Sequence, residues 1–146
     1  MPHLILLAED DIPSADLIRL VCEREGYLVI TAQNGREAID LLAEHPIDLV
    51  LMDVRMPVLD GIEATRRIRS NPKTSDIPVI FVTAMVNPDT VAKMEALNPT
   101  GILLKPFDLR ILMQSLERVL PPEKPRNRLN DLTGLRLVEK PWGVTG

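Results

Sequence analysis

Short apolar runs alternate with longer amphipathic stretches along the first 120 residues of the chain. Five runs are almost unbroken, at residues 4–8, 28–30, 49–52, 79–82 and 102–104. Unbroken runs of this length are typical of strands buried on both faces, because half-exposed strands alternate apolar with polar residues. Between the runs, apolar residues at helical spacing predict helices at residues 14–25, 35–44, 61–70, 88–97 and 107–119.

The strict alternation of five strands with five helices predicts an α/β fold. Parallel strands need crossover connections, which are right-handed, so we expect a doubly wound five-stranded parallel sheet with helices on both faces. For a sheet of this size we predict the flavodoxin-like strand order 2-1-3-4-5. Asn34 and Asp60 are predicted to cap the helices that follow them, and Gly26 suits the end of a helix.

The composition changes at Pro121. Residues 1–120 carry 18 acidic and 12 basic side chains, a balance of −6, whereas residues 121–146 carry 3 acidic and 5 basic ones, a balance of +2. We interpret residues 1–120 as one domain and residues 121–146 as a proline-containing tail without an effector domain. The tail is either a loose extension or a segment that packs on its own domain or on a partner subunit, which leaves a homodimer open. The second interpretation rests on its apolar residues, which are Leu129, Leu132, Leu135, Leu137, Val138 and Trp142.

Several classes of protein are disfavoured by the composition. The single cysteine, Cys22, excludes an internal disulfide framework and is expected to pack in a helix. A net charge of −4 and an aromatic content of 3% argue against direct binding of nucleic acid. There is no apolar run of the roughly 18 residues that a membrane span needs, and no signal-peptide pattern. The sequence therefore predicts a cytoplasmic domain that does not bind a membrane.

Polar residues follow four of the five apolar runs, and in a parallel sheet those positions share one edge. Ligands of such sheets bind at this carboxyl edge. The residues there are Glu9, Asp10, Asp11, Asp53, Thr83, Lys105 and Pro106. Clustered carboxylates repel one another, so they need a shared proton or a hard divalent cation. Because the candidate ligands are oxygen atoms alone, Mg²⁺ is favoured, with Mn²⁺ as the alternative.

The other residues at this edge suit phosphoryl transfer. Lys105 supplies a cation and Thr83 a hydroxyl donor, which is what the oxygens of a transferred phosphoryl group require. The two histidines, His3 and His45, fall elsewhere, so no Ser–His pair is available. A carboxylate can itself be the nucleophile and form an aspartyl phosphate. Asp53, at the end of the central strand, is best placed for that role.

Four segments of the chain resemble the CheY-like receiver domain of bacterial response regulators. They are Leu-Leu-Ala-Glu-Asp-Asp at 6–11, the segment from Leu51 to Gly61, Val-Thr-Ala at 82–84 and Leu-Lys-Pro-Phe at 104–107. The resemblance covers residues 3–120. It implies a stand-alone response regulator of a two-component phosphorelay, which takes a phosphoryl group from a histidine kinase or a phosphotransfer protein. Such a protein signals by phosphorylation-dependent binding of a downstream protein, and its only catalysis is its own phosphorylation and dephosphorylation.

The resemblance also implies a role for each matched residue. Asp53 is the phosphoacceptor, and Thr83 and Lys105 bind the phosphoryl group and sense it. The implied Mg²⁺ ligands are Asp10, Asp53, the main-chain carbonyl of Arg55 and, through a water, Glu9. The Lys105–Pro106 peptide bond is expected to be cis, as in the family.

The chain departs from the family pattern at a few positions. Ile102 stands where receivers usually have a switch residue with a ring, which puts the aromatic switch in doubt. Pro99 is expected to end the preceding helix early. Arg55 and Met85 occupy the positions two residues after Asp53 and Thr83, which tune the phosphoryl lifetime in receivers.

Other interpretations stay open at this point. Haloacid-dehalogenase-like phosphatases also form an aspartyl phosphate, but they need a second Asp where this chain has Arg55. A pseudo-receiver would lack one of Asp10, Asp53 and Lys105, and this chain has all three. Taken alone, the acidic segment that begins at Glu9 can be a solvated loop that caps a helix. Gly61 is interpreted as a backbone requirement, and a basic patch on the third helix as a solvated face; the patch is Arg66, Arg67 and Arg69.

Overall fold

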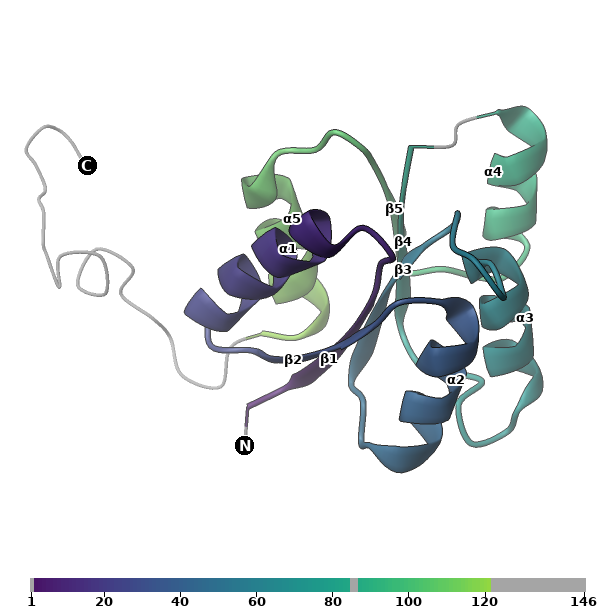
Figure 1. The fold of residues 1–146 in the computed structure, drawn as a ribbon, viewed down its shortest axis with the longest axis horizontal. Coiled ribbons are helices and arrows are strands. Elements are labelled where there is room, and N and C mark those ends of the chain that lie inside the picture. Colours follow the sequence, from purple (N-terminus) through teal and green to yellow (C-terminus); the bar gives the residue numbers. More distant parts are fainter. Residues whose placement is uncertain (1, 85–86, 122–146) are drawn as a thin grey trace, which may run out of the picture.

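Five parallel strands form a single sheet in the order β2-β1-β3-β4-β5, which confirms the predicted strand order (Figure 1). The computed structural model describes residues 2–84 and 87–121. The strands are β1 (Leu4–Ala8), β2 (Leu28–Ala32), β3 (Leu49–Asp53), β4 (Val79–Thr83) and β5 (Gly101–Leu104). Every residue of β3 and β4 is buried, as their unbroken apolar runs predict.

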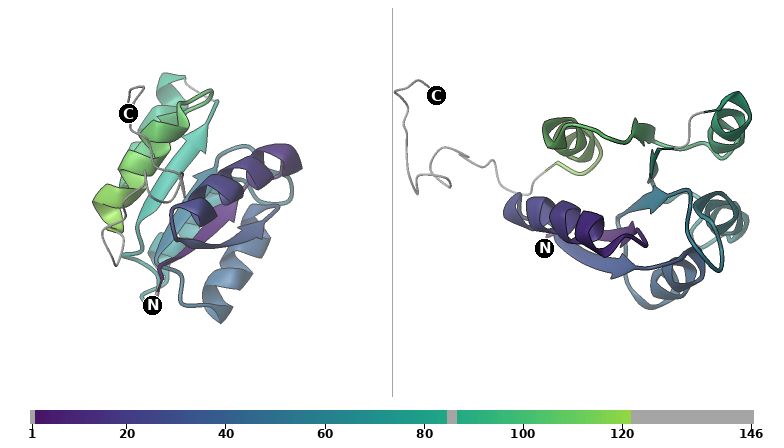
Figure 2. Two further views of the ribbon diagram at one scale, coloured as in Figure 1. Left: turned by 90° about the vertical axis from the view of Figure 1, so that its left-hand side faces the viewer. Right: turned by 45° about the horizontal axis from the view of Figure 1, so that its top comes forward.

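Helices cover both faces of the sheet. They are α1 (Ile12–Arg24), α2 (Gly35–Glu44), α3 (Gly61–Ser70), α4 (Pro88–Glu95) and α5 (Leu109–Val119). Helices α1 and α5 lie on one face, and α2, α3 and α4 lie on the other (Figures 1 and 2). The predicted caps are confirmed, because the side chains of Asn34 and Asp60 accept hydrogen bonds from backbone N–H groups in the first turns of α2 and α3. Gly26 follows α1 with a φ of 98°.

Three helices, α1, α4 and α5, have bounds that differ from the predicted ones by one or two residues. Helix α1 begins two residues early because Asp11 caps it and Pro13 fits its first turn. Helix α5 begins two residues late because Asp108 is its N-cap. Helix α4 ends at Glu95, and the chain turns through Asn98, with a φ of 57°, ahead of Pro99.

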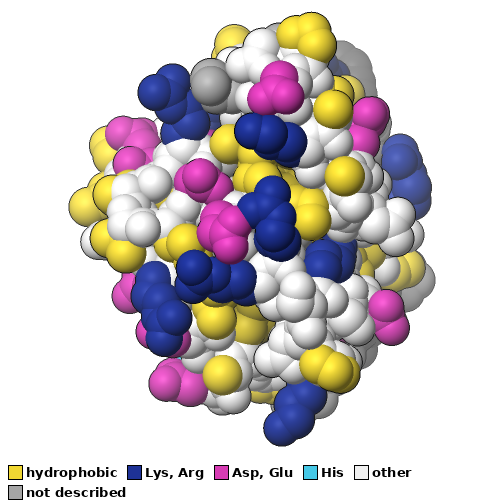
Figure 3. All heavy atoms as spheres, turned by 90° about the vertical axis from the view of Figure 1, so that its right-hand side faces the viewer, with side chains coloured by type: hydrophobic (Ala, Val, Ile, Leu, Met, Phe, Trp, Pro, Cys, Tyr) yellow, Lys and Arg dark blue, Asp and Glu magenta, His cyan; other side chains and the backbone are white. Residues whose placement is uncertain are grey.

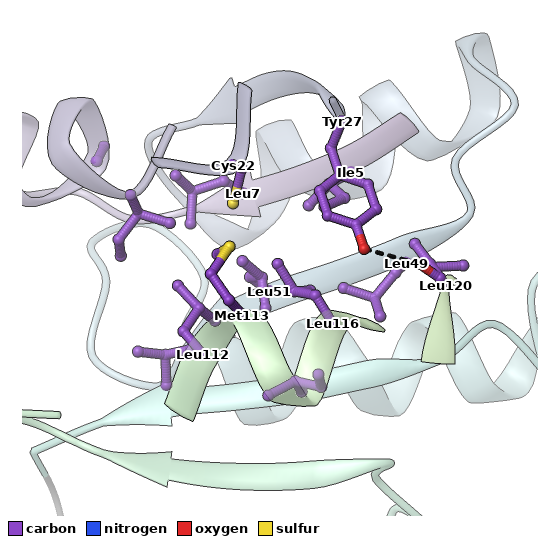
Figure 4. Close-up of a cluster of buried hydrophobic side chains, with 14 residues drawn as sticks. Ile5, Leu7, Cys22, Tyr27, Leu49, Leu51, Leu112, Met113, Leu116 and Leu120 are labelled. Atoms are coloured by element: carbon purple, nitrogen blue, oxygen red, sulfur yellow. Dashed lines mark hydrogen bonds between the residues drawn. The ribbon is translucent and has the colours of Figure 1, made fainter. Parts of the chain in front are cut away.

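Two apolar clusters hold the layers together, one on each face of the sheet. On the α1 and α5 face, Ile5 and Leu7 of β1 meet Leu112 and Leu116 of α5 (Figure 4). Cys22 is fully buried in this cluster, as predicted, and its burial raises the pKa of the thiol to about 12. The other cluster lies on the α2, α3 and α4 face of the sheet. It includes Leu6, Ala8, Val50, Met52, Phe81, Ile68 and Met94.

The end of α5 is held in the apolar cluster on the α1 and α5 face, which includes Leu120. The hydroxyl group of Tyr27 donates to the carbonyl of Leu120 at 2.7 Å, which ties the end of α5 to the start of β2 (Figure 4). Within residues 2–84 and 87–121, none of the helices is both long and apolar enough to cross a bilayer. The predicted tail lies outside the described residues from Pro122 onward.

The face formed by α3 and α4 carries many basic side chains, and acidic ones lie beside several of them (Figure 3). Arg66 and Arg67 are exposed and both pair with Glu63, as expected for a solvated face. The prediction was wrong for Arg69, which is half-buried instead. Its guanidinium donates hydrogen bonds of 2.6–3.2 Å to the carbonyls of Ser75, Ile77, Leu97 and Asn98. Arg69 thus ties the end of α3 to the turn between α4 and β5.

Thr65 of α3 is fully buried, and its Oγ1 has no hydrogen-bond partner among the described residues. A buried hydroxyl without a partner is destabilising, so we expect Thr65→Val, which keeps the shape, to raise the free energy of unfolding by about 1 kcal/mol. Thr74→Val is the matched control, because Thr74 Oγ1 donates to the carbonyl of Ile68 at 2.8 Å. The control should lose about 1 kcal/mol in the same urea titration. A loss of stability in Thr65→Val would contradict the prediction.

Candidate functional site

The strand register brings the predicted site residues to one edge of the sheet. Ala8 of β1 pairs with Met52 of β3, so the next residues along the two strands, Glu9 and Asp53, lie side by side. Thr83 ends β4 and pairs with Leu104 of β5, which places Lys105 just beyond that pair. The sheet is parallel, and all of these residues therefore follow or end their strands at its carboxyl edge.

Lys105 joins the two buried carboxylates of this edge. Its Nζ lies 2.6 Å from Oε1 of Glu9 and 3.0 Å from Oδ2 of Asp53. Glu9 is 3% exposed and Asp53 is 7% exposed. Two carboxylates in so little water are stable only beside a cation, and Lys105 provides it. The sequence predicted that these residues would meet, but it did not indicate that Lys105 contacts Glu9.

Burial and the pairing move the pKa values of these groups. Burial raises the pKa of Glu9; the hydrogen bond from Lys105 opposes the rise, and the neighbouring Asp53 adds to it. Burial lowers the pKa of Lys105, but the bonds to Glu9 and Asp53 outweigh that effect, so the pKa lies above its usual value. Lys105 therefore stays charged at neutral pH.

Three carboxylates form a group that can hold a metal ion. One oxygen each from Glu9, Asp10 and Asp53 lies within 4.8 Å of the others. Asp10 is exposed, whereas the other two are buried, so the group opens toward solvent on one side. The donors are all oxygen atoms, which fits a hard divalent cation such as Mg²⁺.

Asp11 is not part of this group. Its side chain accepts hydrogen bonds from the backbone N–H of Ser14 at 3.0 Å and from the hydroxyl of Ser14, and it thereby caps α1. The bond from Ser14 lowers the pKa of Asp11. The three adjacent acidic residues therefore have different roles. Asp11 caps α1, whereas Glu9 and Asp10 lie beside Asp53.

The remaining predicted residues surround the group. Thr83 is fully buried, and its carbonyl accepts a hydrogen bond from the N–H of Lys105 at 2.9 Å. The peptide bond between Lys105 and Pro106 is cis. Arg55 is exposed and, with Asp10 and residues of α4, lines an open groove of about 630 Å³. Ile102 is half-buried and packs on the cluster beneath α4, while Met85 lies outside the described residues.

Gly61 supports the site in a way that the sequence indicated only as a general backbone requirement. A Cβ atom built on Gly61 would lie 1.9 Å from the carbonyl oxygen of Asp53. The N–H of Gly61 also donates to the carbonyl of Val54 at 2.8 Å. The first residue of α3 therefore packs against the backbone of the central strand, and only glycine leaves room for that approach.

Comparisons with known proteins identify the family. The response regulator receiver domain family matches residues 5–117 of the chain. The response regulator receiver protein CpdR of Brucella abortus is 38% identical over 120 residues, which cover 80% of this chain and 95% of that protein. Two other curated relatives are longer, and the chain spans 53% and 49% of their lengths.

Two solved structures share the fold. The chemotaxis protein CheY4 of Vibrio cholerae is 30% identical with a TM-score of 0.77, over 82% of this chain and all of that one. The receiver domain of the sensor histidine kinase PA1611 from Pseudomonas aeruginosa PAO1 is 31% identical with a TM-score of 0.75, over 82% and 98%. That structure has a magnesium ion coordinated in its active site cleft. Because the receiver domain family matches residues 5–117 and these solved structures share the fold, the chain belongs to the response regulator receiver domains of two-component systems.

Proposed function

We propose that this receiver domain is a phosphorylation-controlled switch whose phosphoacceptor is Asp53. The phosphoryl group comes from a histidine kinase or a phosphotransfer protein. The observation that carries the proposal is the contact of Lys105 Nζ with Oδ2 of Asp53 at 3.0 Å, at the end of the central strand. A carboxylate nucleophile and a cation for phosphoryl oxygens are thereby held in one small site.

The proposed metal site uses the three clustered carboxylates. Asp10, Asp53 and the main-chain carbonyl of Arg55 are the direct ligands, and Glu9 acts through a water molecule. Support comes from the oxygen-only donors, which lie within 4.8 Å of one another, and from the magnesium ion in the PA1611 receiver domain. Mg²⁺ or Mn²⁺, when bound, neutralises the carboxylates and attracts the phosphoryl oxygens.

In the transfer step, a carboxylate oxygen of Asp53 attacks the phosphorus atom of a phosphohistidine. The new P–O bond forms as the P–N bond breaks, and the imidazole leaves with the electron pair of that bond and regains a proton from solvent. Lys105 and the hydroxyl of Thr83 then bind phosphoryl oxygens and so distinguish the phosphorylated protein from the unmodified one.

The protein acts as a switch rather than as an enzyme with a separate substrate. Its catalysis is limited to its own phosphorylation and dephosphorylation, and a phosphohydrolase would need an acid where Arg55 stands. Ile102 has no ring to reorient, so Thr83 and Lys105 carry the signal to the loop after β4 and change the affinity for a downstream protein. We place this switch in the cytoplasm. Its downstream target is a protein rather than a nucleic acid, in keeping with the net charge of −4.

Phosphorylation by a small donor tests the proposal. We expect acetyl phosphate to add one phosphoryl group in the presence of Mg²⁺, and Asp53→Asn to abolish the addition, as measured by intact-protein mass spectrometry. Asp60→Asn is the matched control, because Asp60 lines the groove beside Asp10 and Arg55 and asparagine also caps helices well. The control should be phosphorylated like the unmodified chain. Full phosphorylation of Asp53→Asn would place the nucleophile elsewhere.

A further inference from the structure

Two adjoining hollows run between α1 and α5 on the face opposite α3. The first, of about 450 Å³, is lined by apolar residues that include Val21 and Met113, by Glu25 and Glu117, and by one basic residue, Arg110. The second, of about 500 Å³, lies beside Lys105 and is lined mostly by apolar residues, including Leu17, Ile18 and Phe107. Leu109 lines both hollows, so they adjoin at the start of α5, and we call them together the path.

The chain leaves the fold at the start of this path. Glu25 is the C-cap of α1 and Glu117 lies in the last turn of α5, so the first hollow begins close to the end of α5. Tyr27 fixes the carbonyl of Leu120 there, and His3 Nε2 lies 3.2 Å from the carbonyl of Pro121. The segment that follows therefore starts from an anchored point beside the first hollow and its two glutamates.

The chemistry of the tail follows the same order as the chemistry of the path. Its first part is mainly basic, with Lys124, Arg126 and Arg128 beside Glu123, and its later part holds most of its apolar residues. The apolar residues there are Leu129, Leu132, Leu135, Leu137, Val138 and Trp142. Along the path from Pro121, the glutamates come first and the apolar hollow comes second. The domain and the tail also have net charges of opposite sign, −6 for residues 1–120 and +2 for residues 121–146.

The tail is long enough to reach the hollow beside Lys105. Helix α5 rises about 1.5 Å per residue, so the path from Glu117 back to Leu109 is about 12 Å long. An extended chain from Pro121 to Leu129 spans about 26 Å. Pro121 and Pro122 cannot continue α5 and favour an extended backbone, as a reversal of the chain requires. About half of the surface of Leu17 and of Leu20 on α1 is exposed, at 51% and 53%, and can be covered by the returning segment.

We propose that residues 122–146 fold back along α1 and α5 of their own domain, with the basic part over Glu25 and Glu117 and the apolar part in the hollow beside Lys105. The proposal stands on the two hollows and the sequence of the tail, and it holds whether or not Asp53 is phosphorylated.

Amide chemical shifts of the full chain test the first half of the proposal. Substituting Lys124, Arg126 and Arg128 together by Glu changes only residues beyond the described fold, so the domain stays folded. We expect the amide shifts of Val21, Glu25, Met113 and Glu117 to change. The control carries the same charge change on the opposite face, in Arg36→Glu, Arg66→Glu and Arg67→Glu, and should leave those four amides unmoved. Unchanged amides in the tail variant would overturn the proposal.

Fluorescence of Trp142, the single tryptophan, tests the second half. We expect its emission in the full chain to lie at shorter wavelength than in a peptide of residues 121–146. Leu17→Asp with Leu20→Asp should shift it to the wavelength of the peptide, whereas the control, Val58→Asp at an exposed loop position, should not. Emission equal to that of the peptide in the unmodified chain would overturn this half. A short-wavelength emission that is lost on dilution, together with a dimer in sedimentation, would assign the path to a second copy and also overturn the proposal.

Discussion

Gly61→Ala is expected to lower the free energy of unfolding by at least about 3 kcal/mol, at the upper end of the cost of overpacking. The added Cβ would lie 1.9 Å from the carbonyl oxygen of Asp53 and 2.9 Å from Cγ of Met52. Both neighbours belong to the central strand, in which every residue is buried, so neither can move aside without disturbing the sheet. Urea unfolding measures the loss.

The same substitution should slow the phosphorylation of Asp53, because relief of the clash must displace the backbone that carries this carboxylate. Gly101→Ala is the matched control, since a Cβ at Gly101 meets nothing within 4 Å. The control should keep or slightly raise stability, by about 0.5 kcal/mol, because alanine restricts the unfolded chain. Equal stability of the two variants would show that the backbone near Asp53 is more pliable than its burial indicates.

The sequence predicted the fold and the edge of the sheet where the site lies, for one physical reason. The run that becomes β3 has no polar residue before Asp53, and such a run is stable only between two layers of helices. Parallel strands end at a common edge, so Glu9, Asp53 and Lys105 had to approach one another whatever their side-chain rotamers. The periodicity predicts the parallel sheet, and the proximity of these residues follows from that sheet and from the flavodoxin-like strand order.

The contacts made by individual charged side chains could not be predicted in the same way. A charge in a helical segment indicates a solvated face, and Arg69 fitted that pattern although it binds four carbonyls of distant segments. Asp11 and Asp10 are adjacent and chemically alike, yet only the position of Ser14 makes Asp11 the cap of α1. These partners are set by tertiary packing, which local periodicity does not encode.

Lys105→Met is expected to lower the free energy of unfolding at pH 7 by about 2 kcal/mol, because it removes the cation that pairs two buried carboxylates. The loss is smaller than for a fully buried pair, since a quarter of the Lys105 side chain is exposed to solvent, which screens the charge. Lys93→Met is the matched control. Lys93 pairs with Asp89 at 3.2 Å on the surface of α4, so its loss should cost less than about 0.5 kcal/mol.

The deficit of Lys105→Met should depend on pH and on Mg²⁺ in ways that the deficit of the control does not. Burial raises the folded-state pKa of Glu9 and Lys105 opposes that rise, so removing Lys105 raises this pKa further. A carboxyl group with a raised folded-state pKa destabilises the fold once the unfolded chain ionises, so the deficit should grow as the pH rises above about 4.3 and shrink below it. Mg²⁺ should narrow the deficit at pH 7, because a bound cation replaces the lost charge beside Asp53 and stabilises only the folded chain. A deficit that is the same at pH 4 and pH 7 and with and without Mg²⁺ would mean that Lys105 contributes by packing rather than by neutralising the carboxylates.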